Sequence, residues 1–298
     1  MITPSSYASS LAAPHGGIAL RTSAAFRTVR RHPTIAVGGA LLACMVLIAL
    51  FAPVLGTVDP GALSPMLRTR DPSAQFWFGT DMMGRDVYSR VLYGTRVSLV
   101  VGISVAVFAS IGGLLVGIVA GFSRRADAII MRLMDGLMAI PAILLAVALM
   151  ALTRGSIGNV ILAITIPEIP RVARLVRGVV LGLREQPYVD AAVAAGTRTP
   201  KILYMHILPN TFPHLIVQAS YICASAMIAE AILSFIGAGT PPIVPSWGNI
   251  MAEGRALWQV KFYIVMFPAI FLSLTVLAVN LLGDGLRDSL DPRLAGRL

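Results

Sequence analysis

The most regular feature of the chain is a series of long apolar runs separated by stretches that carry most of the charge. Crossing the hydrocarbon core of a bilayer takes about 20 residues of α-helix. Six runs approach or exceed that length, and they cover residues 34–55, 97–122, 128–152, 157–180, 212–237 and 262–282. The pattern predicts an all-α polytopic membrane protein with six transmembrane helices.

The fourth run differs from the others because proline and charge interrupt it. Only residues 157–166 are continuously apolar, which alone is too short to span. The interruption contains Pro167, Glu168, Pro170, Arg171, Arg174 and Arg177. A crossing is still favoured, because only then do the basic segment 171–201 and the basic C-terminal tail share one side. We expect Glu168 to face a water-filled cavity, where a broken backbone is tolerated.

Composition narrows the class of protein. Of the 298 residues, 56% are hydrophobic and 13% are charged, about half the charged fraction of an ordinary soluble domain. That balance excludes a water-soluble enzyme. The net charge of +10 would suit nucleic-acid binding if it formed one patch, but the cations fall between the apolar runs. With six spans, sixteen of the 24 cations fall on one side of the membrane, so we expect both termini to be cytoplasmic. We also expect lipid around the spans and no nucleic-acid partner.

The spans divide the chain into one membrane domain and short flanking segments. We expect a cytoplasmic tail at 1–33, the membrane domain at 34–284, outer segments at 56–96 and 238–261, and a second cytoplasmic tail at 285–298. The first run is too long for a typical signal-peptide core, which favours an uncleaved helix. Residues 80–92 space apolar and charged side chains so as to predict a helix on the membrane surface. A solvated loop with a short helix fits that spacing equally well.

Small residues recur along one face of the second run. Ala109, Gly113, Gly117 and Gly121 are spaced four apart. Such a face lets two membrane helices approach closely, so we expect it to pack against another helix. The pattern leaves open whether that helix belongs to this chain or to a partner.

Ionisable side chains inside spans are further candidates, because charge in the hydrocarbon core is costly. Glu230 lies about one and a half turns from the outer end of the fifth run, and it should face either the lumen or a structural partner. Asp135 follows Arg132 by one turn, which favours a local ion pair. Asp135 and Asp284 would suit an intramembrane aspartyl protease, but the Gly-x-Gly-Asp sequence of that class does not precede Asp284. That alternative is remote.

Sequence motifs for other chemistries do not occur in the chain. It has no phosphate-binding G-x-x-x-x-G-K-[ST] loop, no G-x-S-x-G, no H-E-x-x-H and no filter-like channel sequence. Its two cysteines, Cys44 and Cys223, are far apart inside apolar runs. We therefore expect no catalytic residue, no metal site and no cofactor bound by this chain.

The most informative stretch is the loop 185–210 between the fourth and fifth runs. Pro187 suits the first turn of a helix, the alanines after it favour helix, and Gly196 suits a positive-φ end. Thr199 and Pro200 then resemble the N-cap and first turn of a second short helix that stops near Pro209. Two short helices outside the membrane would make a docking surface, although an ordinary connecting loop would show the same pattern.

This loop resembles the Glu-Ala-Ala loop of the inner-membrane permease subunits of ATP-binding-cassette importers, and within them the C-type subunit of dipeptide and oligopeptide permeases. The matching residues are Asp190, Ala191, Ala192, Gly196, Leu208 and Pro209. Asp190 stands where Glu is usual, and His206 stands where Ile is usual. Three further stretches are similar to the same family: FGTDMMGRDVYSR at 78–90, LSFIG at 233–237 followed by PP and PSWG, and GDGLRDSLDPR at 283–293.

The resemblance implies a type I importer fold in the bacterial plasma (inner) membrane. It implies a homologous second permease subunit, two ATPase subunits that use ATP and Mg²⁺, and an extracytoplasmic solute-binding protein. The Glu-Ala-Ala loop would couple to the ATPase subunits and drive alternating access. Relatives import dipeptides, oligopeptides, glutathione, nickel complexes or haem, so a peptide importer is expected and the other solutes stay open.

Overall fold

The computed structural model describes residues 33–153 and 155–290, and helices are the main regular elements of this part. The long helices are α2 (Pro33–Phe51), α3 (Val87–Phe122), α6 (Ile157–Arg184), α9 (Leu208–Phe235) and α11 (Tyr263–Leu290). The shorter ones are α4 (Arg124–Met138), α5 (Ala142–Ala151), α7 (Pro187–Ala194), α8 (Thr199–Ile202) and α10 (Trp247–Gly254). Strand pairing in the described residues is limited to the isolated bridge between Thr80 and Asp86. The all-α prediction is confirmed.

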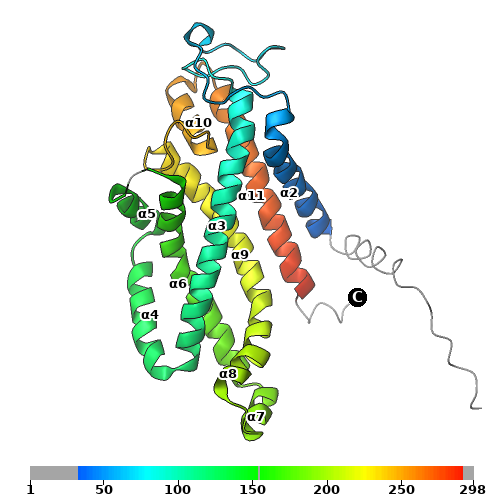
Figure 1. Ribbon diagram of the computed structural model, residues 1–298, viewed down its shortest axis with the longest axis vertical. Helices are drawn as coiled ribbons and strands as arrows, with labels where there is room; N and C mark the ends of the chain where they lie inside the picture. The colour runs from blue at the N-terminus through cyan, green and yellow to red at the C-terminus, as the bar shows by residue number, and fades with distance from the viewer. Residues whose placement is uncertain (1–32, 154, 291–298) are drawn as a thin grey trace, which may run out of the picture.

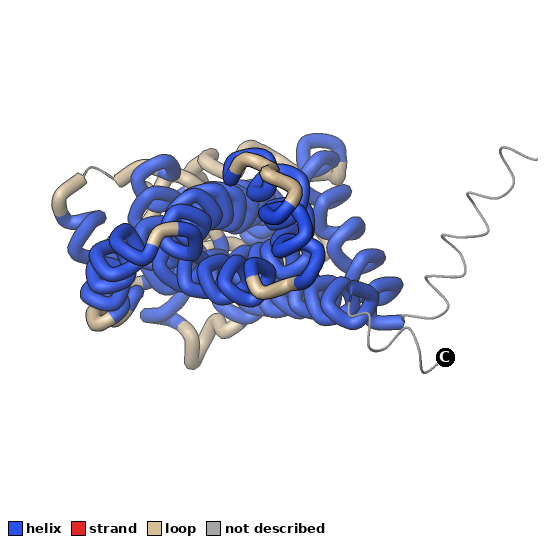
Figure 2. Tube along the Cα trace, turned by 90° about the horizontal axis from the view of Figure 1, so that it is seen from below, coloured by secondary structure: helices blue, strands red, loops and turns tan. Residues whose placement is uncertain are grey.

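The long helices form one bundle along the long axis of the molecule (Figure 1). Helix α3 packs most extensively against α6 and also contacts α9, while α2 packs along α11. Viewed from below, the helices of the described residues group side by side in one bundle (Figure 2). The segment before α3 and the helix α10 lie at one end of the bundle, and α7 and α8 project from the other (Figure 1). The two connecting regions singled out in the sequence therefore occupy opposite ends.

The structure supports fewer uninterrupted spans than the sequence predicts. Four helices are long and apolar enough to cross a membrane, namely Pro33–Val54, Val87–Phe122, Thr199–Phe235 and Tyr263–Ser289. Helices α4 and α5 qualify only as a pair bent by 85°. Helix α6 is about 42 Å long at 1.5 Å per residue, but its charged residues exclude it from the apolar set. The count of six spans is therefore not established by length and composition.

The predicted third span, 128–152, is broken because of Pro141. This proline directly precedes α5, and α4 ends three residues earlier at Met138. A residue before proline is disfavoured in the α region, and proline has no N–H to continue the helical ladder. The apolar run is therefore continuous in sequence, whereas the helix changes direction within it.

The glycine stripe of α3 packs against α6 of the same chain. A Cβ added to Gly113 would lie 2.3 Å from Cβ of Val172, and one on Gly121 would lie 2.7 Å from Cγ1 of Val180. Between them, a Cβ on Gly117 would lie 2.7 Å from both the Ala173 carbonyl oxygen and Cβ of Val176. The stripe thus allows the backbones of α3 and α6 to approach within one subunit.

We expect Gly117→Ala to destabilise the bundle by about 1–3 kcal/mol, the usual cost of overpacking. The carbonyl oxygen of Ala173 belongs to the helix backbone and cannot rotate away from the new methyl group. Thermal unfolding of the purified protein would measure the effect. Gly136→Ala in α4 is the matched control, because its Cβ would meet nothing within 4 Å and alanine favours helix over glycine. Equal stability of the two variants would show that the α3–α6 contact is not close.

Candidate functional site

The loop 185–210 forms two short helices at the lower end of the bundle (Figure 1). Helix α7 begins at Pro187 and closes at Gly196, whose φ of +73° is the left-handed conformation that glycine adopts without strain. The Gly196 and Thr197 amides donate to the carbonyls of Val193 and Ala192 at 2.9 and 3.0 Å, respectively, which completes the turn. The expected helix-ending role of Gly196 matches this geometry.

The second short helix departs from its prediction in two respects. Arg198, and not Thr199, is the N-cap residue of α8. The expected break near Pro209 is absent, because a π turn at Leu203–Ile207 joins α8 directly to α9. Pro209 lies in the first turn of α9, where an N–H group has no helical acceptor and its loss costs little.

Three buried side chains, Val189, Ile202 and Ile207, fix the two short helices to the bundle. Asp190, Ala191, Gly196 and Pro209 are exposed, whereas Ala192 and Leu208 are half-buried. Large apolar side chains of the same loop are also exposed, including Tyr204 at 72% and Val193 at 59%. Sequence reasoning missed this apolar surface, because an exposed and a buried Val or Tyr look alike in a short loop. Exposed apolar side chains grouped in this way are typical of a protein contact.

A buried cluster of charges holds the opposite end together. Asp81, Arg85, Arg90 and Glu253 form it, and we call it the outer charge cluster. Oδ2 of Asp81 accepts from Nε of Arg85 at 2.7 Å and from Nη1 of Arg90 at 2.6 Å. Both arginines also donate to Glu253 of α10. The cluster ties the segment before α3 to α10.

The predicted surface helix at 80–92 is therefore wrong. Residues 80–86 form a turn closed by the Thr80–Asp86 bridge, and α3 begins at Val87, where the Asp86 side chain accepts from the Ser89 amide. Arg90 is 1% exposed and Asp81 is fully buried. The spacing of charges suggested a solvated face, but their partner Glu253 is 163 residues away from Arg90 in sequence. Periodicity carries no information about such a partner.

The polar residues predicted inside spans have partners within this chain. Glu230 is fully buried and accepts from Ser234 at 2.8 Å, in a hydroxyl cluster that continues to Thr240 and Asn249. Its carboxyl group thus lies between α9 and the segment leading to α10. Glu168 is also buried, and its Oε2 lies 3.2 Å from Nη1 of Arg171.

Two further ion pairs join α4 to α6. Asp135 pairs with Arg174 at 2.6 Å, and Asp127 accepts hydrogen bonds from both Nε and Nη2 of Arg177. The local pair expected between Asp135 and Arg132 is therefore wrong, because α6 offers a closer cation from across the helix pair. Asp284 accepts from the Tyr221 hydroxyl at 2.5 Å and does not meet Asp135.

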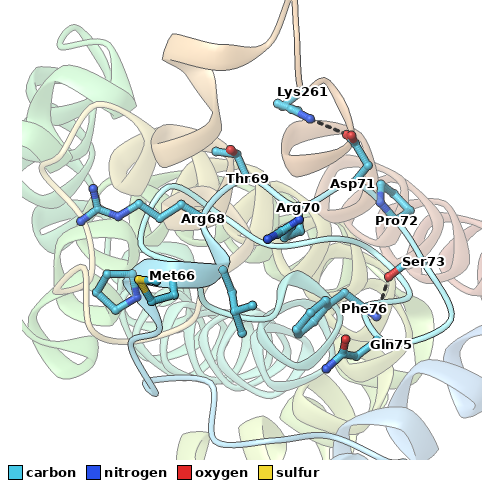
Figure 3. Close-up of a pocket in the computed structure, with 12 residues that line it drawn as sticks. Met66, Arg68, Thr69, Arg70, Asp71, Pro72, Ser73, Gln75, Phe76 and Lys261 are labelled. Atoms are coloured by element: carbon cyan, nitrogen blue, oxygen red, sulfur yellow. Dashed lines mark hydrogen bonds and ion pairs between the residues drawn. The ribbon is translucent and has the colours of Figure 1, made fainter.

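A surface hollow of about 860 Å³ opens at the end of the bundle formed by the segment before α3 (Figure 3). Residues 65–73, Gln75, Phe76 and Lys261 line it, and Nζ of Lys261 lies 2.6 Å from Oδ1 of Asp71. Arg68 and Arg70 belong to the same loop. No group of three or more metal-ligating side chains was found within 33–153 and 155–290.

Comparison with known proteins places these features in a family. Residues 113–296 match the family described as the binding-protein-dependent transport system inner membrane component, and residues 22–76 match the N-terminal transmembrane domain of oligopeptide transport permease C. The chain therefore belongs to the inner-membrane permease family of binding-protein-dependent ABC transporters. Within that family it is a C-type permease, as the second match and the relatives below show.

The relatives cover most of the chain. A probable peptide ABC transporter permease protein of Sinorhizobium fredii is 52% identical over 278 residues, which is 93% of this chain and 95% of the relative. A dipeptide transport system permease protein of Alkalihalophilus pseudofirmus is 39% identical, covering 91% and 89%. A glutathione transport system permease protein of Pectobacterium atrosepticum is 40% identical, covering 90% and 89%.

The fold agrees with that assignment. The permease chain of an inward-facing methionine ABC transporter, MetNI, aligns with a TM-score of 0.56 at 19% identity, covering 68% of this chain and 96% of that one. The type I importer fold expected from the resemblance is confirmed. The chain is thus a multi-pass membrane component of an ABC transporter.

Proposed function

We propose that this chain is one of two membrane subunits of an ATP-driven peptide importer. The observation that carries the proposal is the exposed, largely apolar surface of α7 and α8, which includes the Asp190 carboxylate and projects beyond the bundle as a contact for ATPase subunits (Figure 1). The names of the relatives support peptides as the substrate class. The family description supports a separate binding protein that delivers the solute.

The proposed mechanism is alternating access between two membrane subunits. ATP and Mg²⁺ are used by two partner ATPase subunits, whose closure moves α7 and α8. The buried anchors Val189, Ile202 and Ile207 connect these helices to α6 and α9, so the movement reaches the membrane region as a rigid displacement. The proposed orientation places α7, α8 and both termini in the cytoplasm and α10 on the outer side, in agreement with the excess of cations on the cytoplasmic side.

Reconstitution tests the proposal. The chain would be co-purified with its second permease and ATPase subunits and placed in liposomes that contain ATP and Mg²⁺. We expect uptake of a radiolabelled dipeptide only when the solute-binding protein is present outside and ATP inside. If unlabelled glutathione reduced the dipeptide uptake, the substrate would instead be glutathione, the solute in the name of the Pectobacterium relative. Uptake without ATP, or no uptake of any peptide, would contradict the proposed function.

A further inference from the structure

The charged face of α6 lies level with the middle of the apolar region of α3. Added Cβ atoms on Gly113, Gly117 and Gly121 would meet Val172, Val176 and Val180 in turn, so α3 and α6 run parallel in constant register. Gly112 faces Ile169 in the same way. At 1.5 Å per residue, Gly112 lies about 22 Å from one end of the apolar run 97–122 and about 15 Å from the other. Glu168 and Arg171 are therefore level with the central part of the apolar run of α3.

The side chain of Arg171 is exposed at this level of the bundle. It is 53% exposed, whereas the Glu168 side chain beside it is 8% exposed. A guanidinium group that faced hydrocarbon would be costly, so we expect this face of α6 to meet water or protein in the assembled transporter. The helix contains Pro167 and Pro170 at the same level. Each proline removes a backbone hydrogen bond from the helix, which is tolerated where the freed carbonyl is buried in protein or lines a cavity.

The surface of α6 is also open between Arg171 and the end of the helix that leads to α7. Gly178 and Gly182 follow it at i+7 and i+11, which is one face of an α-helix. A Cβ on either glycine would meet nothing within 4 Å. The face of α6 opposite the α3 contact thus carries Arg171 and Arg174 and then the two glycines, which leave open space toward the α7 end of the helix.

The hydrogen bonding of Arg171 leaves most of its donors available. Its Nη1 lies 3.2 and 3.4 Å from the two oxygens of Glu168, and no other ion pair or hydrogen bond of Arg171 occurs within the described part of the chain. A guanidinium has five N–H donors in a planar fork that fits a carboxylate with two parallel bonds. Glu168 fixes one edge of the group and leaves the other edge for an anionic ligand.

We propose that Arg171, held by Glu168, binds the C-terminal carboxylate of the peptide at the middle of the translocation path. This inference rests on the proposed function and adds the group that is recognised. The α-carboxylate is shared by all unmodified peptides, whatever their side chains. One arginine would therefore serve a broad range of peptide sequences. Glu168 is a positioning residue, because it contacts Arg171 and not the substrate.

The test uses the nucleotide-free complex of both permease and ATPase subunits, without the binding protein. Calorimetry would compare binding of alanyl-alanine with binding of alanyl-alanine amide, which lacks the carboxylate. We expect the wild-type complex to prefer the free acid by about 10- to 100-fold, as for a hydrogen-bonded charged pair. Arg171→Gln should remove this preference, and Arg171→Lys should keep part of it. Arg174→Gln is the matched control, because Arg174 is 51% exposed and already pairs with Asp135.

Three results would overturn the proposal: no preference in the wild type, an unchanged preference in Arg171→Gln, or an equal loss of affinity for both ligands. An equal loss together with dissociation of the subunits on gel filtration would assign Arg171 to the contact with the second permease. The proposed function is judged separately by wild-type dipeptide uptake. Uptake without discrimination between acid and amide would thus refute only the role of Arg171.

Discussion

Asp190→Arg and Gly196→Val should each lower ATP-driven uptake more than tenfold without preventing insertion of the protein. Asp190 is exposed in the first turn of α7, where its carboxylate can accept hydrogen bonds from an ATPase subunit. Reversal to arginine replaces attraction with repulsion. It also places a cation at the positive end of a helix. The measurement is uptake by reconstituted complex, with subunit content checked on a gel.

Gly196→Val acts through the backbone. A Cβ there would meet nothing within 4 Å, so the cost comes from the φ of +73° and not from a clash. A branched residue in the left-handed region costs about 1–2 kcal/mol or more, and relieving that strain would change the angle between α7 and α8. Both substitutions lie outside the membrane bundle, so the binding protein should still engage the complex.

Two conservative variants serve as controls for the coupling prediction. Asp190→Glu restores the residue that is usual in the family signature and should keep uptake. Gly196→Asn should keep a large part of it, because asparagine tolerates the left-handed region better than other residues. If Asp190→Arg and Gly196→Val both transport at the wild-type rate, coupling passes through another surface and the role proposed for α7 and α8 must be abandoned.

Arg90→Met should destabilise the protein by about 3–5 kcal/mol, the cost of breaking a buried ion pair by removing one partner. Arg90 is 1% exposed and contacts both Asp81 and Glu253. Its removal leaves the buried carboxylate of Asp81 and the half-buried carboxylate of Glu253 with only Arg85 to neutralise them. The loss should appear as a large drop in the unfolding temperature of the purified protein.

Arg174→Gln is the comparison for this second prediction. Arg174 and Asp135 are each more than half exposed, and an exposed pair contributes about 0–1 kcal/mol. Arg90→Lys should fall between the two, because lysine keeps the charge but cannot reach two carboxylates with one planar fork. Equal stability of Arg90→Met and Arg174→Gln would show that the outer charge cluster does not hold α10 to the start of α3.

Local patterns in the sequence were sufficient for much of the helical architecture. The apolar runs at 34–55, 97–122, 212–237 and 262–282 correspond to the four helices that are long and apolar enough to span. Hydropathy over about 20 residues is a local property, and a bilayer admits few structures besides a helix for such a segment. The turn at Gly196 was also predictable, because a glycine after a short alanine-rich helix is a local signal for a positive φ.

The break at Pro141 and the continuation through Pro209 show where local rules were incomplete. Both prolines follow an apolar stretch, yet α5 restarts after an 85° bend at the first, and α8 continues into α9 at the second. Proline forbids one hydrogen bond and one backbone region but does not dictate the direction of the chain after it. Packing against neighbouring helices decides that direction.

The sequence by itself determined that the chain is an all-helical membrane protein with two short helices before its fifth apolar run and a glycine face on its second, because these features depend on residues close together in the chain. Only the tertiary structure decided which residues are partners. It placed Arg90 beside Glu253, Asp135 beside Arg174 and the glycine face against α6. Such contacts join residues 39 to 163 positions apart, and periodicity within one helix contains no information about the residue that faces it from another.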